Sequence, residues 1–229
     1  MTAIVTGAGR GIGRAIAERL QGEHRVLLVD LDPGVDRLAA EMDADAVVAD
    51  ITDPDGRAAI LDAAGDQVDV LVNNAGITRD ARIVKMTDED FLAVIRVNLG
   101  AAFELTTALR DRFSDGAAVV SLASRAYLGN FGQFNYAASK GGLVGMTRAL
   151  ALELAPRVRV NAIAPSLTAS EMTLAMPDRV REKMIANIPM GRMGEPREIA
   201  ETVAALASPA MAYVTGQVVV ACGGRSLAP

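Results

Sequence analysis

A tyrosine and a lysine stand one helical turn apart in this chain, at Tyr136 and Lys140. Side chains four residues apart project from the same face of a helix, so the phenol and the ammonium can meet. For a phenol to exchange its proton near neutral pH, its pKa must fall by about three units, or roughly 4 kcal/mol. One ammonium at contact distance supplies an effect of that size. The pair therefore predicts an acid–base centre for an alcohol or a carbonyl, although the same pattern alone is common on protein surfaces.

A glycine-rich turn near the start of the chain can hold a dinucleotide. Residues 6–13 read TGAGRGIG, between a short apolar strand and an amphipathic helix. Glycines let the chain turn sharply, let backbone N–H groups approach a pyrophosphate, and let the helix start close to the strand. The spacing G-x-x-x-G-x-G differs from the more familiar G-x-G-x-x-G, but its position favours phosphate binding over a tight connection. The predicted contacts are Gly7, Gly9, Arg10, Gly11, Ile12 and Gly13.

The residue that follows the second predicted strand bears on the choice of dinucleotide. A carboxylate at Asp30 can accept hydrogen bonds from the adenosine ribose hydroxyls, and it repels a 2′-phosphate. A pair of unit charges about 4 Å apart interacts by roughly 4 kcal/mol at an effective dielectric constant near 20. Arg10 argues the other way, because a guanidinium in the glycine turn can pair with that phosphate. We expect NAD rather than NADP, since Asp30 repels NADP and also gains the hydroxyl contacts.

Composition and charge exclude several classes of protein. With 229 residues and 51% apolar content, the chain can bury the core of one large domain. The net charge of −5 and the lack of a basic run argue against nucleic acid. One cysteine, Cys222, excludes an internal disulfide, and one histidine, His24, argues against a Ser–His triad and a metal site. With no charged leader and no long apolar stretch, we expect a soluble, cytoplasmic protein without membrane contact.

Short β-branched runs alternate with helical patterns along the chain. Strands are expected at 3–6, 25–29, 46–49, 68–72, 117–122, 158–163 and 217–220, and helices at 11–21, 34–42, 54–64, 88–111, 135–155 and 196–207. The alternation predicts an α/β, Rossmann-type, doubly wound parallel seven-stranded sheet with helices on both faces. We expect a single dinucleotide-binding domain over 1–229 with an integral active site. Residues 166–195, rich in Met, Pro and charge, are predicted to be a flap that covers the substrate.

The ordered set of motifs resembles the short-chain dehydrogenase/reductase family over essentially all 229 residues. The segments that carry the resemblance are the glycine turn, Asp50-Ile51, Asn73-Asn74-Ala75-Gly76, Asn98, Ser124, Tyr136 and Lys140. Within the family the chain is most similar to the 3-oxoacyl-acyl-carrier-protein reductases, on residues 74–80 (NAGITRD) and 129–136 (GNFGQFNY). The ordered set is far more specific than any one of its members.

The resemblance implies a role for each of four residues. Tyr136 would be the general acid and base, and Lys140 would lower its pKa and bind the nicotinamide ribose. Ser124 would orient the substrate oxygen, although Ser121 competes with it, because the spacing of twelve to the tyrosine is one shorter than usual in the family. Asn98 would support a water-linked proton relay. Its alternative is a buried amide satisfied by the backbone, since its neighbours are apolar at helical spacing.

The resemblance also implies the remainder of the cofactor site. The family's adenine-side pair would be Asp50 and Ile51, and the segment after the fourth strand would contribute Asn74, Ala75 and Gly76. On the nicotinamide side the family often has Pro-Gly followed by a threonine, whereas here the matching positions are Pro165, Ser166, Thr168 and Ser170. Ser170 falls where the carboxamide-binding threonine would be, and Ser166 restricts the backbone relative to glycine.

The predicted helix 135–155 bears on assembly. It contains Gly141, Gly142 and Gly145, each disfavoured by about 1 kcal/mol relative to alanine, which is understandable if another backbone approaches closely. An apolar stripe at 143, 147, 150 and 154 could bury against a neighbour. Family members commonly form tetramers through this helix and the helix that carries Asn98. We therefore expect a homotetramer, with a dimer as the alternative.

These observations together predict an NAD(H)-dependent oxidoreductase that interconverts a ketone and a secondary alcohol. The resemblance favours a 3-oxoacyl or 3-hydroxyacyl thioester as substrate, although no residue can be tied to the thioester arm. A dehydrogenase of small secondary or cyclic alcohols is the alternative within enzymes. A dinucleotide sensor without turnover would need the glycine turn and Asp30 but not Tyr136 with Lys140. An inactive structural subunit is the remaining alternative.

Overall fold

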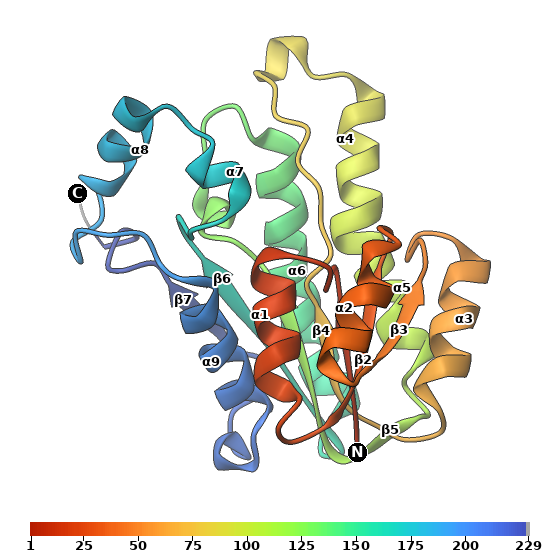
Figure 1. The fold of residues 1–229 in the computed structure, drawn as a ribbon. Helices are drawn as coiled ribbons and strands as arrows, with labels where there is room; N and C mark the ends of the chain where they lie inside the picture. The colour runs from red at the N-terminus through yellow and green to blue at the C-terminus, as the bar shows by residue number, and fades with distance from the viewer. Residues whose placement is uncertain (228–229) are drawn as a thin grey trace.

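Seven strands form one parallel sheet at the centre of the molecule. The computed structural model describes residues 1–227, apart from the side chains of Glu171 and Met172. The strands are β1 (Thr2–Thr6), β2 (Arg25–Asp30), β3 (Asp45–Val48), β4 (Val68–Asn73), β5 (Phe113–Leu122), β6 (Val158–Pro165) and β7 (Val218–Ala221). Their order is β3-β2-β1-β4-β5-β6-β7, and every neighbouring pair is parallel (Figure 1). The predicted Rossmann-type sheet is confirmed.

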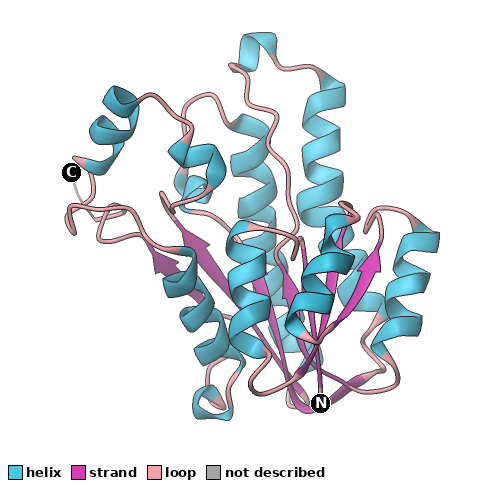
Figure 2. Ribbon diagram, in the orientation of Figure 1, coloured by secondary structure: helices cyan, strands magenta, loops and turns pink. Residues whose placement is uncertain are grey.

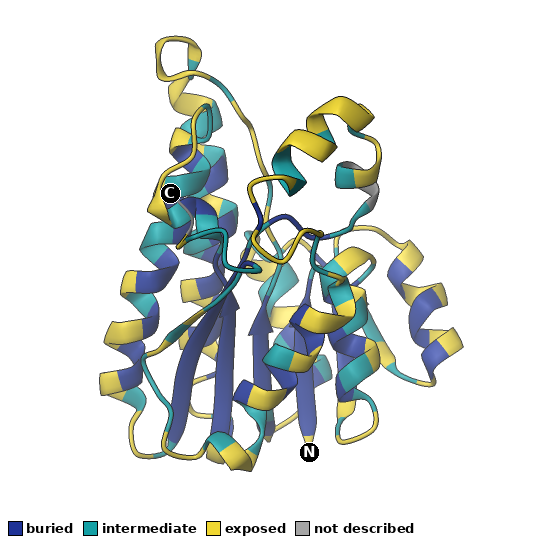
Figure 3. Ribbon diagram, turned by 90° about the vertical axis from the view of Figure 1, so that its left-hand side faces the viewer, coloured by how far each residue is buried: buried dark blue, intermediate teal, exposed yellow. Residues whose placement is uncertain are grey.

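Helices cover both faces of this sheet, which is why its strands are apolar throughout (Figure 2). One face packs on α1 (Gly11–Leu20), α2 (Gly34–Met42) and α9 (Pro196–Ala207). The other packs on α3 (Pro54–Ala64), α5 (Ala101–Ala108) and α6 (Phe134–Leu154). Figure 3 shows the strands and the sheet-facing sides of the helices as buried. The strand order reverses at β1, between β2 and β4, and such a reversal opens a crevice at the carboxyl ends of the strands.

The predicted helix 88–111 differs most from the structure. It ends at Ala108 and consists of α4 (Asp88–Ile95), a π-helical turn (Arg96–Gly100) and α5. A π turn inserts one residue into the helical hydrogen-bond pattern, and such insertions are frequent at functional sites. Asn98 lies inside the turn and is buried. Strand β5 also begins earlier than predicted, at Phe113 rather than at residue 117.

The apolar stripe on α6 is used inside the chain, so the prediction that it buries against a neighbour is wrong. Leu143, Thr147 and Leu150 are buried within the chain itself, and Leu150 belongs to the core between α6 and the sheet. The three glycines of α6 differ in what lies beside them. A Cβ on Gly142 would lie 2.5 Å from Leu99 Cδ2, whereas Gly141 and Gly145 face open space. Only Gly142 is therefore explained by a close approach within the chain.

The α4–α5 region, Asp88–Ala108, is long and apolar enough to cross a membrane by length and composition alone. Its α4 part packs along α6, and its α5 part packs on the sheet. Only 33% of its most apolar window is buried inside the chain, and the core helix of a soluble protein can meet the same criteria.

Candidate active site

The glycine turn connects β1 to α1, and its glycines allow backbone atoms to pack against one another without side chains between them. Gly7 and Gly11 have φ values of +64° and +57°, which favour glycine. A Cβ on Gly13 would overlap the carbonyl oxygen of Gly7, and one on Gly7 would lie 2.9 Å from Ala75 Cα. The Asn74 amide Nδ2 donates to the carbonyl oxygens of Thr6 (2.9 Å) and Gly7 (3.0 Å), which fixes the turn to the end of β4. The result is a tight backbone cradle of the kind that accepts a pyrophosphate.

Asp30 closes this cradle from the end of β2. One of its carboxylate oxygens accepts a hydrogen bond from the Gly9 N–H (2.8 Å), and the other accepts one from the Asp32 N–H (3.0 Å). The carboxylate is half-buried, so it stays accessible beside the turn. This is where a ribose next to a turn-bound pyrophosphate would lie in a doubly wound sheet.

Asp50 and Ile51 follow β3 in a loop that several hydrogen bonds stabilise. The Asp50 carboxylate accepts hydrogen bonds from the Thr52 hydroxyl (2.7 Å) and backbone N–H (2.8 Å), and these lower its pKa. Arg57 donates to the carbonyl oxygen of Ile51 at 3.0 Å. The loop is therefore rigidly built, at the same edge of the sheet as Asp30.

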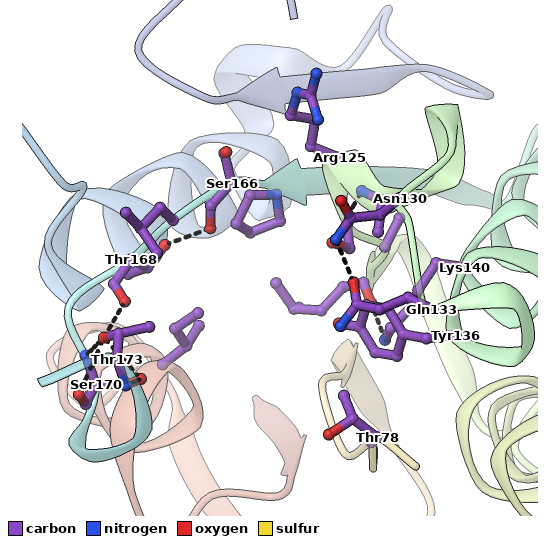
Figure 4. A pocket seen from close by; sticks show the side chains of 18 of the residues that line it. Thr78, Arg125, Asn130, Gln133, Tyr136, Lys140, Ser166, Thr168, Ser170 and Thr173 are labelled. Carbon is purple, nitrogen blue, oxygen red and sulfur yellow. Dashed lines mark hydrogen bonds between the residues drawn. The ribbon is translucent and has the colours of Figure 1, made fainter. Parts of the chain in front are cut away.

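A cavity of about 650 Å³ opens from the glycine turn along the carboxyl ends of β4, β5 and β6 (Figure 4). The predicted site residues that line it are Arg10, Ile12, Asn74, Gly76, Ser124, Tyr136, Lys140, Pro165, Ser166, Thr168 and Ser170. The other predicted cofactor residues do not line the cavity; they lie in the glycine turn and in the loops after β2, β3 and β4: Gly7, Gly9, Gly11, Gly13, Asp30, Asp50, Ile51 and Ala75. The fold thus brings both predicted halves of the site to one edge of the sheet.

Lys140 reaches this cavity from α6 with a nearly fully buried side chain. Its ammonium Nζ donates to the carbonyl oxygen of Leu122 at the end of β5 (2.6 Å) and lies 5.6 Å from the ring centroid of Tyr136. Burial disfavours the charged form and lowers the pKa of Lys140 to about 8. The ammonium and the phenol ring do lie side by side, as their spacing predicts.

The expected lowering of the Tyr136 pKa is not what this geometry produces. Burial raises the pKa of the phenol; a hydrogen bond with Ser124 lowers it, and the charge of Asp80 adds to the rise. The Lys140 ammonium is bound to a backbone carbonyl and lies over the ring, so its charge does not offset the burial. Tyr136 is therefore a protonated phenol near neutral pH, suited to donating its proton.

The structure separates the two competing serines. Ser121 lies within β5 and is buried, and its hydroxyl has no hydrogen-bond partner among the described residues. Ser124 follows the strand, lines the cavity and meets Tyr136. Its hydroxyl also accepts the Ala126 N–H at 3.2 Å, which orients the side chain.

Asn98 makes the contacts that the buried-amide alternative describes. Its side-chain oxygen accepts the Ile77 N–H (2.8 Å), and its Nδ2 donates to the Ile77 carbonyl (3.0 Å) and to the Ser139 hydroxyl (3.1 Å). It therefore ties the segment after β4 to α6. A Cβ on Gly76 would lie 3.1 Å from the Asn98 side-chain oxygen and 3.5 Å from Lys140 Nζ, so the amide and the ammonium border the same small space.

The nicotinamide-side residues are braced by one another. The Thr168 hydroxyl donates to the Ser166 carbonyl oxygen (3.2 Å). Thr173 Oγ1 donates to the Thr168 carbonyl oxygen (2.8 Å) and lies 3.1 Å from the Ser170 hydroxyl. Segment 166–195 contains α7 (Glu171–Leu174) and α8 (Asp178–Ile185), and its two ends meet where Thr168 pairs with Gly194.

Six polar residues that the sequence did not assign also line the cavity: Thr78, Arg125, Asn130, Gln133, Thr173 and Arg225. Gln133 donates to the Asp80 carboxylate (2.8 Å), and Asn130 donates to the Gln133 side-chain oxygen (2.6 Å). Both lie in the quoted segment 129–136, so proximity to Tyr136 was a usable signal. Arg125 follows Ser124 directly, whereas Arg225 comes from the loop after β7. Only the folded chain brings Arg225 to the cavity.

A doubly wound sheet with a glycine cradle beside a cavity that holds a tyrosine, a lysine and a serine defines a nicotinamide-dependent oxidoreductase. A family model described as Enoyl-(Acyl carrier protein) reductase matches residues 7–226. The chain belongs to the short-chain dehydrogenase/reductase family.

The relatives agree on this family over nearly the full length of the chain. The 3-oxoacyl-[acyl-carrier-protein] reductase FabG of Vibrio cholerae is 39% identical over 97% of this chain and 96% of its own length. FabG of Thermotoga maritima is 40% identical over 96% of each chain. A crystal structure described as a short-chain dehydrogenase/reductase, glucose/ribitol dehydrogenase, from Brucella melitensis matches with a TM-score of 0.92 and 35% identity, over 98% of this chain and 96% of that one.

The buried ammonium predicts an unusual dependence of stability on pH. Below pH 8 Lys140 is protonated in both folded and unfolded chains, so folding bears the full cost of burying its charge. Between about 8 and 10.5 only the unfolded chain holds the proton, so the free energy of unfolding rises with pH. The gap between these pKa values corresponds to about 3 kcal/mol.

Urea unfolding at pH 7 and pH 10 measures this effect. We expect the stability of wild type relative to Lys140→Met to increase by about 2–3 kcal/mol between the two pH values. Lys183→Met, at an exposed lysine on α8, is the control and should follow wild type. Parallel pH curves for wild type and Lys140→Met would show that Lys140 titrates as an ordinary lysine.

Proposed function

We propose that the protein is an NAD(H)-dependent reductase or dehydrogenase that interconverts a 3-oxoacyl and a 3-hydroxyacyl thioester. The single observation that carries the proposal is the meeting of Tyr136, Ser124 and buried Lys140 at one wall of the cavity that starts at the glycine cradle. The thioester rests on the names of the curated relatives, which are 3-oxoacyl-[acyl-carrier-protein] reductases. The Brucella melitensis relative is described as a glucose/ribitol dehydrogenase, so a small alcohol is the alternative substrate.

The cavity supplies the proton chemistry of such a reaction. A nicotinamide bound there would supply a hydride to the carbonyl carbon in the reducing direction, and would accept one from the alcohol carbon in the oxidising direction. Ser124 donates a hydrogen bond to the substrate oxygen, and Tyr136 delivers its proton to that oxygen as negative charge develops there. The raised pKa of Tyr136 keeps the phenol protonated, so that it can donate this proton in the reducing direction. In the oxidising direction the phenolate must form, and a protonated Lys140 beside the ring stabilises it.

The other predicted residues hold these groups in place. Asn98 fixes the segment after β4 against α6, which positions Gly76 beside Lys140. In the proposal the same amide borders the water-linked relay that exchanges the proton of Lys140 with solvent. Ser166, Thr168 and Ser170 hold the nicotinamide end, and segment 166–195 covers the substrate.

We propose NAD as the preferred dinucleotide, bound by the glycine turn with Asp50 and Ile51 on its adenine side. Asp30 is anchored to Gly9 of the cradle, so its negative charge stands where a 2′-phosphate would need a cation. Arg10 is exposed and lines the cavity rather than pairing with Asp30, which leaves the carboxylate charge uncompensated by that residue.

We propose a cytoplasmic homotetramer that forms through α6 and the α4–α5 helix. Large apolar side chains on these helices are exposed in the single chain, among them Leu92, Phe103 and Leu152. Gly141 and Gly145 leave open space on α6 that a second backbone can approach. The expected light-scattering mass is four times 23.9 kDa, and a monomeric mass would contradict this assembly.

A nicotinamide absorbance assay tests the proposed reaction. NADH and NADPH are each offered with acetoacetyl thioesters, simple ketones and cyclic ketones. We expect turnover on the thioesters, with NADH preferred, and a loss of at least about a hundredfold in Tyr136→Phe with cofactor affinity retained. Tyr213→Phe, at an exposed tyrosine, is the control. Activity on simple ketones alone would shift the assignment to the small-alcohol dehydrogenase, and cofactor binding without any turnover would indicate a sensor.

A further inference from the structure

The cavity is strongly cationic although the protein as a whole is acidic. The chain carries 28 acidic and 23 basic residues. Yet the described residues that line the cavity include four cations, Arg10, Lys140, Arg125 and Arg225, and no aspartate or glutamate. A cavity with low-dielectric walls and one sign of charge concentrates ligands of the opposite sign. The proposed reaction explains Arg10, at the pyrophosphate turn, and Lys140, beside the phenol. It does not use Arg125 or Arg225.

These two arginines come from distant parts of the chain and approach the same end of the cavity. Arg125 follows Ser124 at the start of a 3-10 turn (Arg125–Leu128) and lies at the top of Figure 4, between Ser166 and Asn130. Arg225 follows β7, and its Nη1 is 3.4 Å from the Ser166 hydroxyl. Both arginines line the same cavity, and the pKa of Arg225 is lowered by burial and by the charge of Arg125, while Cys222 raises it.

Neither guanidinium is neutralised within the described part of the chain. No ion pair forms there to Arg125 or Arg225, whereas eight other arginines pair with carboxylates. The Arg125 Nε is buried and, among the described residues, has no hydrogen-bond partner. A buried donor left unpaired is costly, and two adjacent unpaired cations add repulsion. An anion between them would relieve both costs.

We propose that Arg125 and Arg225 bind an anionic oxygen group of the substrate, a carboxylate or a phosphate. A guanidinium offers planar paired donors that match either group. Because Arg125 is adjacent in sequence to Ser124, this contact orients the substrate at the residue that holds the reacting oxygen. The inference rests on the proposed function and narrows its substrate to an oxo compound that carries an anion, either on the oxoacyl group itself or on its thioester carrier.

Kinetics with four substrates that share the acetoacetyl group distinguish a carboxylate on the oxoacyl group from a phosphate on the thioester carrier. Acetoacetate carries a carboxylate, acetoacetyl-coenzyme A carries phosphates, and methyl acetoacetate and acetoacetyl-N-acetylcysteamine carry no charge. The variant is Arg125→Met/Arg225→Met. For the anionic substrate that uses the site, we expect kcat/KM to fall by about tenfold to a hundredfold, mainly through KM, with less than about threefold change on the neutral ones. Arg37→Met/Arg197→Met, at two exposed arginines on α2 and α9, removes the same number of charges and is the control for net charge.

The pattern of losses decides the outcome. A selective loss on acetoacetate identifies a carboxylate, and a selective loss on the coenzyme A thioester identifies a phosphate. An equal loss on all four substrates, or no loss, overturns the proposal. Arg125→Lys/Arg225→Lys keeps both charges and should recover part of the selective loss, which a folding defect would not allow.

A wild type that turns over none of the four would contradict the proposed function but not yet the anion site. Calorimetry with NAD-loaded protein then decides, using acetoacetate and inorganic phosphate as probes. Binding of either probe by wild type and its loss in the methionine variant would support the site. No binding by wild type would overturn it.

Discussion

The buried ammonium of Lys140 is the constraint on which the site depends. Burial is the cause that lowers its pKa to about 8, and its hydrogen bond goes to the Leu122 carbonyl at the end of β5. A buried cation is costly unless the groups around it supply hydrogen bonds and leave room for it. Gly76 leaves room for it, and the π turn at Asn98 aims an amide at the same space. The sheet edge, the irregular helix and α6 are therefore arranged around one charge.

The same burial controls both partners of the proton-transfer pair. It disfavours charge on Lys140 and on Tyr136, so the lysine gives up its proton before the phenol does. In the free protein the phenol is thus protonated and can act as a general acid, rather than being an activated phenolate. Activation in the oxidising direction requires Lys140 to keep its proton at the pH where the phenol ionises, and an anionic dinucleotide beside it would favour that protonated form. The spacing of the two residues identifies the pair but does not show which of the two groups loses its proton first.

Patterns that depend on neighbouring residues were predictable, and those that depend on distant packing were not. The strand and helix alternation gave the sheet, because apolar runs and glycine turns are local signals. The glycine turn and the tyrosine–lysine pair can be predicted as motifs because each is contiguous in the sequence, and Asp30 because it directly follows a predicted strand. The π turn holds Asn98 against Ile77 on the segment after β4, a distant partner that the local sequence does not reveal. The α6 stripe was misassigned because periodicity shows that a face is buried but not what covers it. Arg225 reaches the cavity only through the position of β7.

Titration of the Tyr136 phenol tests the central claim most directly. Tyrosinate absorbance is recorded against pH for wild type and Lys140→Met, with and without NAD, and Tyr136→Phe spectra are subtracted to remove the other two of the three tyrosines. The account predicts that free Tyr136 titrates above 10, and that NAD lowers its pKa in wild type by more than in Lys140→Met. An equal response to NAD in the two proteins would contradict the account, because the charge of Lys140 would then have no part in activating the phenol.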